Sequence, residues 1–128
     1  MQLEAKYVFI GNALVALFFG LGFIFSPNMI LEMCGPITGG AGEIMGVHYG
    51  MTITSLAVFM LLIRNQPHSD FRQSVFLYLI FGWAMTFIYQ VYMIYAFGYG
   101  NPVWITTVAI DFILVALYGY LYYTNMIS

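Results

Sequence analysis

The amino-acid sequence predicts an all-α membrane protein, a bundle of four transmembrane helices with a short interfacial helix between the first and the second. Hydrophobic residues make up 62% of the chain and charged residues only 6%, whereas soluble domains average about 25% charged residues. The chain also contains four apolar stretches, each near the roughly 20 residues that cross a hydrocarbon core. These stretches and their short connections occupy nearly the whole chain, so we expect a single domain over residues 1–128.

The boundaries of the four spans follow from where polar, glycine and proline residues interrupt the apolar stretches. The spans are expected at about residues 7–25, 43–63, 71–97 and 102–123. Between the second and third spans, residues 64–70 are polar and contain Pro67, which is typical of a short loop between helices. Before the last span, a glycine-containing turn leads to Pro102, and proline is well suited to the first position of a helix.

The short helix is expected over residues 28–33, immediately after Ser26 and Pro27. Serine is a favoured helix cap, and proline is favoured at the first helical position. The segment contains methionine, isoleucine and leucine, a composition that suits a helix lying in the membrane interface. We therefore place it at the outer surface of the membrane.

The three basic residues predict the orientation of the chain. Lys6 precedes the first span, and Arg64 and Arg72 flank the loop between the second and third spans. Basic residues are concentrated on the cytoplasmic side of membrane proteins. All three lie on that side if both termini are cytoplasmic, and we expect a bacterial inner membrane or an equivalent one. Three basic residues are too few to form the positively charged patch that binds nucleic-acid phosphates, so we do not expect a nucleic-acid partner.

The single cysteine excludes several kinds of chemistry. Cys34 has no partner cysteine in the chain for a disulfide, so a redox relay through cysteine pairs is excluded, and so are cysteine-rich zinc or iron–sulfur sites. The sequence also lacks a nucleophile elbow, a phosphate-binding loop and a metalloprotease helix. We expect no metal site and no catalytic activity of the chain's own, and the sequence identifies no cofactor.

Small residues recur every fourth position in the second span, as Gly42, Gly46 and Gly50, and Thr54 continues the row. Such a row lets helix backbones approach closely, which drives helix association in lipid. The first span has a comparable row, consisting of Asn12, Ala16 and Gly20. We expect these rows to face other helices; an alternative is that the glycines make room for a flat ligand.

Asp111 is the strongest functional candidate, because it lies in the middle of the fourth span with no basic residue near it in sequence. An acidic residue at the centre of a spanning helix costs about 2.5–3.5 kcal/mol on insertion scales, so it is expected to face protein, water or a ligand. Two interpretations stay open: a structural acid that is protonated or hydrogen-bonded to a neighbouring helix, and a site that binds a proton, a cation or a ligand.

Three further polar residues are candidates for the same site: His48 and Glu43 of the second span and Gln90 of the third. At 1.5 Å per residue, His48 lies about 7 Å deeper than Glu43, Gln90 about 10 Å below the outer surface and Asp111 about 13 Å below it. His48, Gln90 and Asp111 could therefore converge in the outer half of the bundle. His48 could equally be a hydrogen-bonded packing residue, a haem or pigment ligand, or a partner that Asp111 orients.

Local patterns resemble those of small bacterial four-helix membrane proteins, the DoxX-like proteins and related families of unknown function. The resemblance rests on Gly20-Leu21-Gly22 near the end of the first span, the proline-led segment 27–31 and the glycine-rich entry to the second span. It implies a membrane subunit, in some cases associated with respiratory or oxidative enzymes. No catalytic residue can be transferred from it.

Three hypotheses for function follow. The leading one is an accessory or structural subunit of a larger integral membrane complex, of respiratory, oxidative or photosynthetic type, whose partners are the lipid bilayer and other membrane subunits or further copies of the chain. Abundant Phe, Tyr and Met side chains provide adaptable lateral packing surfaces. The alternatives are a redox subunit that binds a quinone or pigment, and a small proton-coupled transporter that uses Asp111.

Overall fold

The fold is all-α, as the sequence predicts. The computed structural model describes residues 4–34, 40–98 and 102–126, and no strand occurs among them. The helices are α1 (Ala5–Phe25), α2 (Pro27–Cys34), α3 (Gly40–Ile63), α4 (Asp70–Phe97) and α5 (Pro102–Met126). Within these helices, the side-chain surroundings of residues 31–34, 40–43 and 125–126 are outside the description.

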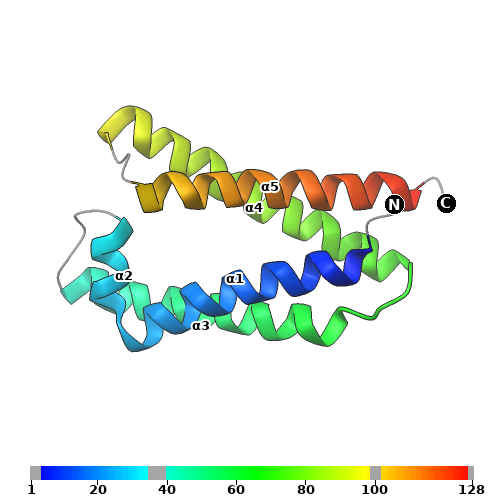
Figure 1. Ribbon diagram of the computed structural model, residues 1–128, viewed down its shortest axis with the longest axis horizontal. Coiled ribbons are helices and arrows are strands. Elements are labelled where there is room, and N and C mark those ends of the chain that lie inside the picture. Colours follow the sequence, from blue (N-terminus) through cyan, green and yellow to red (C-terminus); the bar gives the residue numbers. More distant parts are fainter. Residues whose placement is uncertain (1–3, 35–39, 99–101, 127–128) are drawn as a thin grey trace. The chain divides into compact units, whose positions relative to one another are not determined.

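Four helices are long and apolar enough to cross a membrane, which confirms the predicted number of spans and the membrane class. The qualifying stretches are Ala5–Phe25, Ile44–Ile63, Asp70–Phe97 and Pro102–Thr124. The short helix expected between the first two spans is α2. The chain divides into two compact units, Phe9–Arg64 and the combination of Asn65–Ser128 with Met1–Val8, and each unit is described by itself below (Figure 1).

In the unit Phe9–Arg64, α1 and α3 pack closely through small residues. A β-carbon added to Gly50 would lie 2.6 Å from the backbone oxygen of Gly20 and 2.8 Å from the β-carbon of Phe23. One turn away, the rings of Phe23 and Tyr49 meet edge to face with centroids 5.4 Å apart. Because the backbones touch at the glycines, the aromatic rings beside them also come within contact distance.

The connection from α1 to α2 is tight and is held by backbone hydrogen bonds. The Ser26 N–H donates to the Gly22 carbonyl at 2.8 Å, and the Ile30 N–H donates to the Ser26 carbonyl at 3.2 Å. Ile30 folds back against α1, where a β-carbon on Gly22 would lie 2.9 Å from its δ-carbon. Ile30 is thereby buried, which anchors the start of α2 to the end of α1.

The unit that contains Asn65–Ser128 is a helical hairpin of α4 and α5, which run in opposite directions (Figure 1). Ser69 begins α4 as its cap, since the Ser69 side chain accepts a hydrogen bond from the Arg72 N–H at 3.1 Å. Gly98 ends α4 in the left-handed conformation, with a φ of 73°, and its N–H donates to the Ile94 and Met93 carbonyls. Only glycine adopts that conformation without strain. Pro102 is the first residue of α5.

Candidate functional site

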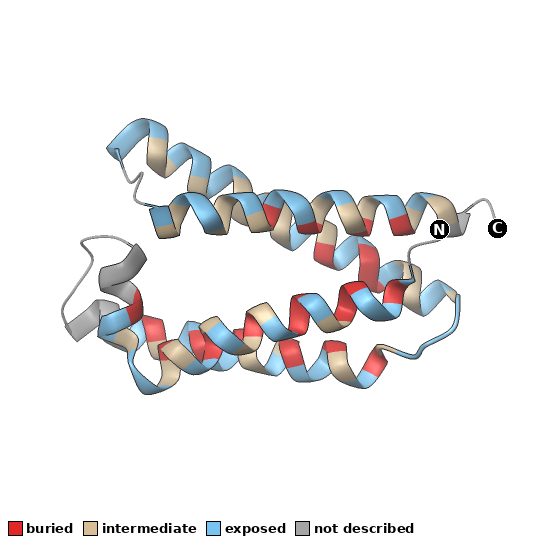
Figure 2. Ribbon diagram, in the orientation of Figure 1, coloured by how far each residue is buried: buried red, intermediate tan, exposed pale blue. Residues whose placement is uncertain are grey.

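Asp111 is buried, with only 4% of its surface exposed. It lies on the same face of α5 as Leu114, Tyr118 and Leu121, which are also buried, because residues three, seven and ten positions apart share one side of a helix. All four of these buried residues lie in the part of α5 from Asp111 toward the C-terminus (Figure 2). No donor in the described part of the chain bonds to the Oδ2 atom of Asp111.

The register of the α4–α5 hairpin is set by two hydrogen bonds, one near each end. The indole N–H of Trp104 donates to the Gln90 carbonyl at 3.2 Å, and the side-chain amide of Gln73 donates to the Tyr122 carbonyl at 3.2 Å. Two ring contacts lie between them: Phe87 with Phe112, at 5.8 Å between centroids, and Phe76 with Tyr118, at 6.1 Å. These contacts fix which residues of the two helices lie level.

Asp111 lies level with the part of α4 between Trp83 and Phe87. Seven residues separate Trp104 from Asp111, and seven separate Gln90 from Trp83. The Trp104–Gln90 hydrogen bond therefore brings Trp83 to within about one helical turn of the level of Asp111, and the Phe87–Phe112 contact brings Phe87 close to that level. The sequence reasoning did not single out Trp83. A polar atom inside an aromatic side chain gives no hydropathy signal, and the register that brings Trp83 near the level of Asp111 is a property of the packed hairpin.

Between the middle of this hairpin and the α4–α5 turn, three side chains carry buried polar atoms that make no hydrogen bond within the described residues: the indole N–H of Trp83, the Oε1 of Gln90 and the Oδ2 of Asp111. Nearer the loop between α3 and α4, the Oε1 of Gln73 and the Nε of Arg72 are also buried and make no hydrogen bond within the described residues. Most buried polar atoms in folded proteins have a partner, either protein or ordered water. A group of such atoms on one hairpin therefore marks a place where water or a ligand can bind.

Gln90 lies about two helical turns from the level of Asp111, toward the connection between α4 and α5. Seven residues of helix correspond to a rise of about 10 Å, and Gln90 is held near Trp104 by the indole hydrogen bond to its carbonyl. Between them, Thr107 lies one turn from Asp111, and its hydroxyl donates to the Trp104 carbonyl at 2.7 Å. Within the hairpin, the polar side chains of Gln90, Thr107 and Asp111 thus follow one another inward from the turn.

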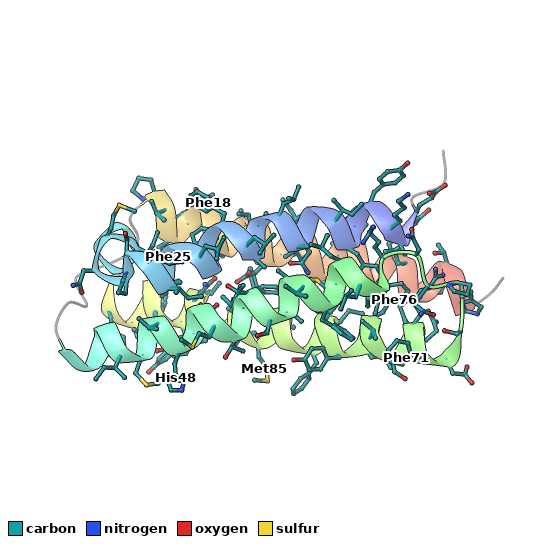
Figure 3. The ribbon with its side chains drawn as sticks, turned by 90° about the horizontal axis from the view of Figure 1, so that it is seen from below. Phe18, Phe25, His48, Phe71, Phe76 and Met85 are labelled. Atoms are coloured by element: carbon teal, nitrogen blue, oxygen red, sulfur yellow. The ribbon has the colours of Figure 1, made fainter. Side chains whose placement is uncertain are left out.

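His48 is exposed on α3, and Figure 3 shows its imidazole pointing away from the helix ribbon. Thr52 and Ser55 are exposed as well, four and seven residues further on, so all three lie on one side of α3. We call His48, Thr52 and Ser55 the α3 stripe. His48 lies in the unit Phe9–Arg64, whereas Gln90 and Asp111 lie in the unit that contains Asn65–Ser128. The convergence of the three residues therefore stays a prediction.

The remaining sequence candidates lie in α1 and α3. Asn12 is 1% exposed, between the buried residues Phe9 and Ala16 of the same helix. Gly46 is buried, and Gly50 packs against Gly20. The surroundings of Gly42 and Glu43 are outside the description, so a role for either stays a prediction.

Comparisons with protein families, with curated proteins and with solved structures find no match to this chain. In the described part of the chain, no group of three histidine, cysteine, aspartate or glutamate side chains lies close enough to hold a metal ion. Candidate sites therefore rest on the geometry of the chain itself, and two features stand out: the buried polar atoms of the α4–α5 hairpin and the exposed α3 stripe.

Proposed function

We propose that this protein is an accessory subunit of a larger integral membrane complex and that it joins the complex through the α3 stripe. The single observation that carries the proposal is that His48, Thr52 and Ser55 are exposed on one side of a helix that is apolar enough to cross a membrane. Exposed Leu, Ile and Phe side chains on such a helix suit lipid. An exposed imidazole suits a protein neighbour instead.

The two hydroxyl groups of the stripe are compatible with lipid, but the imidazole is not. The Thr52 hydroxyl donates to the His48 carbonyl at 3.1 Å, and the Ser55 hydroxyl donates to the Met51 carbonyl at 2.9 Å. Such bonds to the preceding turn satisfy a hydroxyl without a second helix. A histidine ring carries a donor and an acceptor at its far edge, so its hydrogen bonds in a bilayer have to come from outside α3.

The partner that this surface fits is a transmembrane helix of a different protein, with a hydrogen-bonding side chain opposite His48. Thr52 and Ser55 are short, so a neighbouring helix can approach the stripe closely, as small residues allow in membranes. The resemblance to DoxX-like proteins supports a respiratory or oxidative complex, and both termini are proposed to be cytoplasmic, as the basic residues predict.

The proposal is tested by purifying the tagged protein from its native membrane in a mild detergent and measuring subunit stoichiometry by mass spectrometry. A second membrane protein is expected in fixed ratio. The combined substitutions His48→Leu, Thr52→Val and Ser55→Ala are expected to weaken its retention by roughly tenfold or more, since polar contacts between helices contribute about 0.6 kcal/mol each, and up to about 1.7.

The matched control is Met85→Leu, a conservative change at an exposed position of α4 (Figure 3), which is expected to leave the stoichiometry unchanged. A stable assembly that contains only copies of this chain would contradict the proposal. So would a partner whose retention is the same in the triple variant as in the wild type.

A further inference from the structure

The middle of the α4–α5 hairpin combines a buried acid with other buried polar atoms and contains no basic side chain. Within the described residues, the Oδ2 of Asp111 has no donor, and the indole N–H of Trp83, about one helical turn from its level, has no acceptor. Two helical turns closer to the C-terminal end of α4, the Oε1 of Gln90 is also buried and makes no hydrogen bond to any residue that the structure describes. This cluster is separate from the α3 stripe and is not used by the proposed function.

No basic side chain of the hairpin can neutralise Asp111. The only arginine of α4 is Arg72, eleven residues before Trp83, which corresponds to about 16 Å along the helix. Its guanidinium already donates to the Gln66 carbonyl at 3.0 Å and lies over the Phe76 ring, 5.5 Å from the centroid. These contacts hold the Arg72 guanidinium at the start of α4, away from Asp111.

The tyrosines of this hairpin give Asp111 no charged neighbour either, since a tyrosine side chain is neutral at neutral pH. Tyr118 lies two turns along the same face of α5, and Tyr78 and Tyr89 of α4 are exposed. On α1 and α3, the acids and bases whose surroundings are described are all exposed; they are Lys6, Tyr7, His48 and Tyr49.

A carboxyl group in this setting is far easier to accommodate with a proton than without one. An ionised carboxylate can only accept hydrogen bonds and is very costly to bury unpaired, whereas the neutral acid gains an O–H donor and loses the charge. The Thr107 hydroxyl oxygen can accept a hydrogen bond from water, the side-chain Oε1 of Gln90 can do the same, and the Trp83 N–H can donate one. Buried water commonly bridges polar groups of this kind.

We propose that Asp111 is a proton-binding site midway along the α4–α5 hairpin, and that water held by Trp83, Thr107 and Gln90 lets this proton exchange with the aqueous phase. The distance from Gln90 to Asp111 is about 10 Å along the helices, which about three hydrogen-bonded waters span at roughly 2.8 Å each. The proton moves along this chain by transfer between neighbouring oxygens, and no other reactant is consumed.

Infrared spectroscopy of the full chain in phosphatidylcholine vesicles at neutral pH tests this directly. The chain has two aspartates, Asp70 and Asp111, so in an Asp70→Asn variant made by cell-free synthesis with aspartate ¹³C-labelled at the side-chain carboxyl, only Asp111 carries the label. We expect a ¹³C-shifted carbonyl band of a protonated carboxylic acid, which moves again when the vesicles are transferred to D₂O. Asp111→Asn removes this band.

The water path is tested by the rate at which the labelled carbonyl band shifts after transfer to D₂O. Trp83→Phe combined with Gln90→Leu is expected to slow the exchange by roughly tenfold, the scale of a lost hydrogen bond to water. Tyr89→Phe, which removes one polar group from the exposed face of the same helix, is expected to leave the rate unchanged. A labelled band of an ionised carboxylate in the folded protein would overturn the proton site, and wild-type exchange in the double variant would overturn the assignment of the path.

Discussion

Gly20 and Gly50 set the distance between α1 and α3. A β-carbon on Gly20 would overlap the Thr54 hydroxyl oxygen, and one on Gly50 would lie 2.6 Å from the Gly20 backbone oxygen. Contacts this short are not tolerated between real atoms, and the second involves backbone, which cannot move aside as a flexible side chain does. The helices would have to separate to admit either methyl group.

Gly50→Ala is therefore expected to destabilise the folded protein by about 1–3 kcal/mol, the usual effect of overpacking. Reversible unfolding in detergent micelles measures the change. Gly82→Ala is the matched control, because nothing lies within 4 Å of a β-carbon there; it is expected to be neutral or to stabilise α4 by up to about 1 kcal/mol. Equal effects of the two substitutions would show that close packing at Gly50 is not important.

At the residue scale, the sequence identifies which side chains are unusual but not what surrounds them. Asp111 is conspicuous as an acid inside an apolar span, and it is indeed buried. His48 is equally conspicuous, yet it is exposed. Polar and apolar residues are mixed around each spanning helix, so helical periodicity gives no single packed face from which the side of a given residue could be predicted.

At the scale of the elements, the helix ends are the best predicted feature. The spans expected at about 7–25, 43–63, 71–97 and 102–123 correspond to α1 Ala5–Phe25, α3 Gly40–Ile63, α4 Asp70–Phe97 and α5 Pro102–Met126. The close agreement has a local cause, since serine, glycine and proline determine where helices begin and end through the backbone itself. The register of α4 against α5 has no such local cause, so the part of α4 that lies level with Asp111 could not be predicted.

Ser69 gives a direct test of that local control. Its side chain accepts the Arg72 N–H at 3.1 Å and its own backbone is extended, as in a helix cap. Ser69→Ala is expected to cost about 1 kcal/mol of unfolding free energy and to speed hydrogen exchange in the first turn of α4. Ser74→Ala removes an exposed hydroxyl that bonds only to the Asp70 carbonyl of the preceding turn, and a change within about 0.5 kcal/mol is expected. Similar losses for both serines would contradict the capping role.

At the scale of the whole molecule, composition alone predicts the class of protein, because a chain with 62% hydrophobic and 6% charged residues cannot cover a water-exposed surface with polar groups. The structure adds two compact units, one built on the close contact of α1 with α3 and one on the α4–α5 hairpin. The single domain over 1–128 stays a prediction. The proposed lateral contact rests on His48, Thr52 and Ser55, which are exposed on one side of α3.

Site-specific photo-crosslinking in the native membrane tests the proposed lateral contact most directly. A benzophenone amino acid is placed at Thr52, within the α3 stripe, and in a separate variant at Met85, on the exposed side of α4. We predict that illumination of the Thr52 variant joins this chain to one other membrane protein in high yield, while the Met85 variant gives no such adduct. Crosslinks from Thr52 only to lipid, or only to further copies of this chain, would contradict the account.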